Sequence, residues 1–241
     1  MLNKDHIQFG TYRLQIEMDD IPTELSALRL NGIYSAFELF INGELVGGIG
    51  EVSQNKQSYQ IGLKPFYPTF SIDQKEVEIV LLVANDTTYR KMGGITKPII
   101  FGNATSIEQL KWSEIIFQSI VAAIFLSYLL YIALLYSIGI REKIVWSFSS
   151  TVLFTALSIL IDNERILLSI LPLDNELGFR LIHFFYIGTL LSMLKFILDL
   201  FPDSTASKSL QSLIYFSIAY MISFLIFPIE WISIAKFIFN F

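Results

Sequence analysis

Apolar residues follow different patterns in the two halves of the chain. Residues 115–139 hold about 25 positions without one charged side chain, enough for a helix to cross a bilayer core of roughly 30 Å. Before this stretch, short apolar runs alternate with polar and turn residues, whereas further long apolar segments follow it. The pattern predicts a β domain over residues 1–110 and a helical membrane domain over residues 111–241.

Short strands joined by turns are expected in the first domain. The segments with the length and residue types of strands are residues 9–18, 25–33, 36–41, 44–46, 77–84 and 97–102. Asn42-Gly43 favours a type I′ hairpin turn, because both residues tolerate positive φ. Gly47-Gly48-Ile49-Gly50 precedes no helix, so we interpret it as a bulge or bend. Together these features predict a β-sandwich.

Several segments after residue 114 have the apolarity of membrane spans. They are residues 115–139, 144–161, 179–198 and 212–227, with the start of a fifth expected after residue 231. Basic residues follow the first and third spans, and short basic loops face the cytoplasm. We therefore expect a multi-pass cell-membrane protein with an extracytoplasmic β domain and cytoplasmic loops at residues 140–143 and 199–211.

Charge and composition exclude several functions. The net charge of −5 argues against nucleic-acid binding, which needs a basic surface. The chain has no cysteine and only two histidines, so we expect no disulfide, no thiol nucleophile, no metal site and no cofactor. It carries none of the short motifs of hydrolases, kinases or nucleotide-binding loops, and we expect it not to be an enzyme.

Loop aromatics provide the first candidate binding surface. Tyr59, Phe66 and Tyr67 lie in a long polar and aromatic segment, where rings can stack on sugars; core packing under the loop is the competing interpretation. Arg90 and Lys91 precede two glycines and are candidates for contact with an anionic ligand, although such pairs are more often solvated.

The membrane domain holds a second set of candidates. Trp112 stands where an interfacial aromatic anchor is expected. Asn163, Glu164 and Arg165 form a polar cluster that would bind a ligand or couple the domains, unless it is a solvated loop. His183 lies inside a predicted span, where ionisable groups are functional candidates, but simple packing is the commoner role.

Several motifs, taken in order, resemble one known family. In the first domain they are residues 10–14 (GTYRL), 35–47 (SAFELFINGELVG), 77–85 and 90–95 (RKMGGI). The membrane domain adds a basic turn at 141–143, then 163–165, 171–172, 180–181 and 200–202. This series is similar to that of bacterial seven-transmembrane receptors with diverse intracellular signalling modules, whose ectodomain is a jelly-roll, galactose-binding-like sandwich.

The resemblance implies a sensor for signal transduction. Such receptors begin with a signal peptide and end in a cytoplasmic kinase, cyclase or phosphatase module; neither feature is visible here, so we expect a fragment. The implied partners are membrane lipid, a small ligand for which carbohydrate is one candidate, and a second copy or a separate signalling protein. Residues 111–114 would then couple ligand binding to the first span.

Two other classes of function stay open at this point. One is a transporter or channel subunit with an accessory β domain, although the spans hold few polar groups and no broken-helix pair is visible. The other is a membrane enzyme that uses Asp162, Glu164 and His183, which requires these groups to converge at one membrane face.

Overall fold

The computed structural model describes residues 7–33, 35–53, 58–86, 94–140, 142–171, 173–202 and 207–227. The chain divides into two compact units, which we describe separately. We call them the β unit, built mainly from Met1–Glu114, and the membrane unit, built from Ile115–Pro172 and Leu177–Lys236. The predicted domain boundary at residue 110 and the unit boundary at Glu114 both fall inside one helix.

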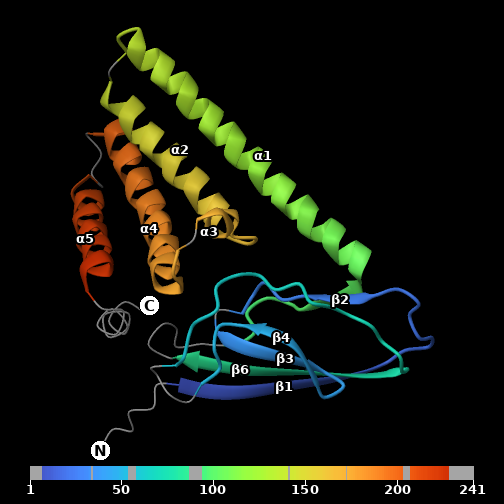
Figure 1. The fold of residues 1–241 in the computed structure, drawn as a ribbon. Coiled ribbons are helices and arrows are strands. Elements are labelled where there is room, and N and C mark those ends of the chain that lie inside the picture. The colour runs from blue at the N-terminus through green and yellow to red at the C-terminus, as the bar shows by residue number, and fades with distance from the viewer. Residues whose placement is uncertain are drawn as a thin grey trace, which may run out of the picture. The chain divides into compact units, whose positions relative to one another are not determined.

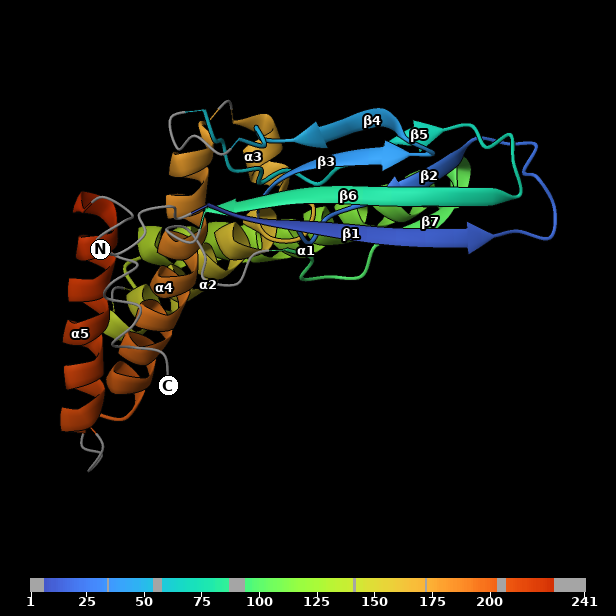
Figure 2. The ribbon, with the colours of Figure 1, turned by 90° about the horizontal axis from the view of Figure 1, so that it is seen from below.

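The β unit contains two antiparallel sheets. Its strands are β1 (Ile7–Glu17), β2 (Ser26–Arg29), β3 (Ala36–Ile41), β4 (Glu44–Ile49), β5 (Thr69–Phe70), β6 (Glu76–Asp86) and β7 (Ile100–Asn103). One sheet has the order β1-β6-β3-β4 and the other the order β5-β2-β7. Figure 2 shows β1 at the edge of the larger sheet, with β6 and β3 following it.

Alternate residues of the central strands form the core of the β unit. Phe37 and Leu39 of β3 lie opposite Val83 and Leu81 of β6, and all four are almost fully buried. Directly opposite residues of an antiparallel pair share one face, so these side chains form a continuous apolar layer. Leu28 and Leu30 belong to the same cluster, which therefore joins the strand segment of β2 to the larger sheet.

The predicted hairpin is confirmed. Asn42 has φ 50° and Gly43 has φ 85°, the conformation that a two-residue type I′ turn requires between β3 and β4. The register shifts between Leu39 and Phe40, opposite the glycines of β4, which confirms the bulge.

Other predicted boundaries were wrong. The strand predicted at residues 25–33 pairs continuously only over β2, and beyond it Leu30 and Ile33 form isolated bridges to Phe66 and Ile95. The last strand, predicted at residues 97–102, is β7 and begins at Ile100.

Helices make up the membrane unit. They are α1 (Ala104–Ser137), α2 (Lys143–Ile161), α3 (Ile166–Ile170), α4 (Asn175–Leu200) and α5 (Ser207–Ile226). Among the described residues, four of these helices are long and apolar enough to cross a membrane: α1, α2, α4 and α5. The predicted fifth span lies outside the described residues.

Helices also occupy parts of the chain that lie outside the predicted spans. Helix α1 begins at Ala104, because the Asn103 side chain accepts a 2.7 Å hydrogen bond from the backbone N–H of Ser106 and caps the first turn. Residues 162–178, which separate the second and third predicted spans, contain α3 and the first turn of α4.

Small and polar residues lie between α2 and α4, and Figure 1 shows α4 between α2 and α5. The hydroxyls of Ser158 in α2 and Thr189 in α4 are 3.0 Å apart. Gly188 faces Phe154 so closely that an added Cβ would lie 2.4 Å from the ring. Close approach through small residues is the usual way in which helices associate in lipid.

Candidate ligand-binding site

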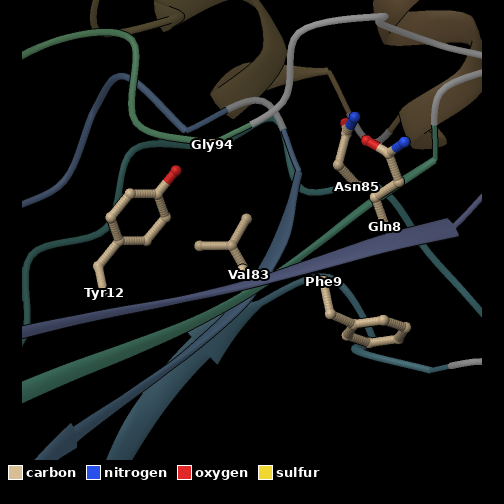
Figure 3. Close-up of a pocket in the computed structure, with 7 residues that line it drawn as sticks. Gln8, Phe9, Tyr12, Val83, Asn85 and Gly94 are labelled. Atoms are coloured by element: carbon tan, nitrogen blue, oxygen red, sulfur yellow. The ribbon is translucent and has the colours of Figure 1, made fainter.

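A pocket lies on the inner face of β1, where this edge strand pairs with β6. The register sets Gln8 opposite Asn85 and Gly10 opposite Val83, so these four residues share one face. The pocket has a volume of about 130 Å³, and Tyr12 and Gly94 line it as well. Figure 3 shows this arrangement, with Phe9 on the opposite side of the strand.

An aromatic ring forms one side of this pocket, which we call the β1 pocket. Tyr12 is 44% exposed although it belongs to the core-facing side of β1. Its hydroxyl points toward Gly94 (Figure 3), where a Cβ would lie only 2.4 Å from the oxygen. Gly94 also has φ +92°, so both its backbone and its lack of a side chain fit this position. The Tyr12 ring thus stands beside open space above Gly10.

Two carboxamides lie at the other end of the pocket. Figure 3 shows the Gln8 and Asn85 side chains next to each other. Asn85 is 5% exposed, and its Oδ1 accepts a 3.1 Å hydrogen bond from the hydroxyl of Ser35. This bond holds the carboxamide with its oxygen toward Ser35 and leaves the NH₂ group on the other side of the group.

The lining of the β1 pocket suits a neutral polar molecule. Its described lining residues carry no charge, and they combine an aromatic face with amide donors and acceptors. Binding pockets usually join apolar walls with a few placed polar groups in this way, but those for drug-sized ligands occupy about 300–1,000 Å³. The smaller volume here limits the occupant to a small molecule or to one terminal group of a larger one.

The predicted loop aromatics do not line this pocket. Tyr59 is buried, and burial raises the pKa of its phenol. It borders a separate pocket of about 630 Å³ with Ile49 and Leu63. Phe66 packs edge-on against Phe37, with ring centroids 5.8 Å apart, and therefore belongs to the core.

Tyr67 contacts a helix. The Nζ atom of Lys111, in the first part of α1, lies 5.0 Å from the centroid of the Tyr67 ring. This distance is within the range of a cation–π interaction. The predicted cationic residues Arg90 and Lys91 lie outside the described residues, in the segment that connects Asp86 to Gly94.

The predicted polar cluster of the membrane unit is a buried turn. Glu164 is 5% exposed and Arg165 2%, so the interpretation as a solvated loop was wrong. Asn163 and Arg165 have φ 47° and 52°, a left-handed conformation that is unusual for residues other than glycine. The Nε2 atom of Gln118 in α1 donates to the Asp162 carbonyl at 3.1 Å and to the Ile159 carbonyl at 3.3 Å.

His183 packs among aromatic rings. Its ring stacks on Phe224 with centroids 4.7 Å apart, and its Nδ1 lies 3.0 Å from the carbonyl oxygen of Phe179. One turn away, Arg180 donates to the carbonyls of Phe224 and Phe227 at 2.7 and 3.1 Å, which caps the C-terminal end of α5. Trp112 is 52% exposed on α1, and its role as an interfacial anchor stays a prediction.

Among the described residues, no group of three or more His, Asp or Glu side chains is placed to hold a metal ion. Comparison with known proteins adds no assignment, because no family model and no curated protein matches the chain.

Sequence reasoning missed the β1 pocket. Gln8 and Asn85 are ordinary polar residues at the two ends of apolar strands, and only the register of β1 with β6 brings them together. The one local clue was Tyr12, two residues after Gly10, on the face that continues the core pattern.

Proposed function

We propose that this chain is the sensor part of a bacterial membrane receptor of the seven-transmembrane type with intracellular signalling modules. The β unit would be a jelly-roll, galactose-binding-like sandwich on the extracytoplasmic side. It would bind a small neutral ligand of the carbohydrate type and pass the signal through the membrane helices to a signalling module. The described residues include four helices able to span a membrane together with a two-sheet β unit, and this combination supports the proposal.

The β1 pocket carries the ligand assignment. Sugar rings present an apolar face and several hydroxyls, which the Tyr12 ring and the two carboxamides complement. The absence of charge among the described lining residues favours a neutral sugar over an acidic one.

The route from the ligand would run through α1. The first eleven residues of this helix belong to the β unit and the remainder to the membrane unit. A ligand that binds two conformations of the β unit with different affinity would shift their populations, and with them the conformation at the start of the first span.

Calorimetric titration of the full chain in lipid nanodiscs tests the ligand assignment. A panel of neutral monosaccharides is titrated into the wild type and into the variants Tyr12→Ala and Gln8→Ala. Each loss is expected to weaken binding by about 1–3 kcal/mol, roughly 5- to 150-fold. Thr11→Ala is the matched control, because Thr11 is exposed on the other face of the same strand.

Two results would contradict the proposal. Absence of heat with every sugar at millimolar concentration would remove the carbohydrate assignment. Equal weakening by Tyr12→Ala and Thr11→Ala would move the site away from the β1 pocket.

A further inference from the structure

We propose that Arg29 and Tyr67 are positioning residues that hold the start of the first membrane helix against the strand pair formed by β2 and residues 66–70. We call this contact the helix seat. All of its residues belong to the β unit. Its purpose in signalling rests on the proposed function, whereas the contact itself is defined without reference to any ligand.

The outer face of β2 is buried although it points away from the core. Leu28 and Leu30 belong to the core cluster, so their neighbours Ala27 and Arg29 lie on the opposite face of the strand. Nevertheless Ala27 is 1% exposed and Arg29 4%. The core does not cover this face of β2, and the contacts described next show that α1 does.

Small residues make room for the helix. Ala27 lies directly opposite Gly102 of β7. Ile107 of α1 lies against Gly102: a Cβ added to Gly102 would be 3.7 Å from the Cδ1 atom of Ile107. Ile107 is only 4% exposed. The first turn of α1 therefore packs against Gly102, which has no side chain and pairs with the small Ala27.

Two polar contacts continue along the same face of the helix. Lys111 and Glu114 follow Ile107 by four and seven residues, a spacing that places all three on one side of a helix. Lys111 lies over the Tyr67 ring, and Glu114 forms a bidentate ion pair with Arg29, at 2.7 Å to Nη1 and 2.5 Å to Nη2. The forked guanidinium fixes the orientation of the carboxylate as well as its distance.

The strand partners of these two contacts lie next to each other. The flanking pairs Leu30↔Phe66 and Ala27↔Thr69 set a register in which Arg29 is opposite Tyr67, on the same face. A shift of this strand pair therefore moves both polar contacts of the helix together. Glu114 is also the last charged residue before the apolar stretch of residues 115–139, so the seat ends where the first span begins.

Spin labelling of the full chain in phosphatidylcholine nanodiscs tests the seat without any ligand. The natural chain has no cysteine, so Gln109→Cys gives one labelling position, on the exposed side of the seated turns. In an Arg29→Ala background we expect the mobile fraction of this nitroxide to rise at least twofold. Combining Arg29→Glu with Glu114→Arg should return it toward the wild-type value.

Matched variants separate positioning from general damage. Arg13→Ala breaks another ion pair of the β unit, with Glu78 on the exposed face of the large sheet, and should leave the label at position 109 unchanged. Tyr67→Leu should raise its mobility, whereas Tyr67→Phe keeps the ring and should not. A second label at Glu44→Cys, in the β3–β4 hairpin, should be unaffected by Arg29→Ala.

Unchanged mobility at position 109 in Arg29→Ala would overturn the helix seat. Equal mobilisation at positions 44 and 109 would also overturn it, because the role of Arg29 would then be general stability. Neither result depends on sugar binding, so failure of the seat and failure of the proposed ligand site are distinguishable.

Discussion

The two units differ in where their large apolar side chains lie. In the β unit the central residues are apolar, with Phe37 and Leu39 almost fully inaccessible. In the membrane unit, serines are buried beside apolar residues such as Phe224, whereas other large apolar side chains, such as Phe117 at 69% and Leu130 at 66% exposure, point outward. The first pattern minimises apolar contact with water, and the second is that of helices surrounded by lipid. Burial of a side chain therefore has to be judged against the solvent of the unit in which it lies.

The largest expected effect comes from one substitution made in both environments. Phe37→Ala removes a ring from the core of the β unit and should lower the free energy of unfolding by about 3–5 kcal/mol. Phe117→Ala removes a ring that is 69% exposed and should cost less than about 1 kcal/mol, because no packed cavity is created. Denaturant unfolding of each variant in the same micelles measures the two changes in the free energy of unfolding. Equal changes would show that Phe117 is packed as tightly as Phe37.

Adding an apolar residue inside the membrane unit should have the next largest effect. Gly188→Leu places a side chain where Phe154 already leaves no room, and overpacking of this kind costs about 1–3 kcal/mol. Leu190→Phe enlarges an exposed side chain two positions away and serves as the control. Thermal unfolding in detergent should show a lower midpoint for Gly188→Leu alone; a similar shift in both variants would argue against close α2–α4 packing.

A smaller effect is expected from the buried tyrosine of the β unit. Burial raises the pKa of Tyr59, so its neutral form stabilises the folded state fully below pH 10. This contribution is lost as the pH rises through the higher folded-state pKa, because the unfolded chain releases its proton first. Tyr59→Phe should therefore lose less stability than the wild type between pH 9 and pH 11.

Unfolding midpoints of both proteins across that range provide the measurement. The comparison at pH 7 is the control, since both side chains are then uncharged. Parallel curves at high pH would show that the phenol of Tyr59 is not the group that titrates.

The sequence was sufficient for features that depend on local chemistry. Asn42-Gly43 predicted its turn because both residues accept positive φ, and uninterrupted apolar length predicted the helices that can span a membrane. The start of α1 was missed, because Asn103 acts as a cap only when the following residues turn into a helix.

Features that depend on pairing between distant strands were not predictable. The β1 pocket needs the register of Gln8 with Asn85, and Tyr67 meets Lys111 only because β2 orders the segment that contains it. The polar turn at residues 163–165 looked solvated because its composition is that of a surface loop. Its burial follows from tertiary packing, which no local pattern records.

Because α1 is one uninterrupted helix, the number of its residues sets the direction in which its later side chains point. Each residue advances a helix by about 100°, so one residue inserted after Glu114 would turn every later side chain of α1 by that angle with respect to Ile107. An insertion of about seven residues, close to two full turns, would nearly restore the phase. The length of this helix therefore fixes the rotation of its second part relative to its first part. We expect related chains to differ in this length by whole helical turns.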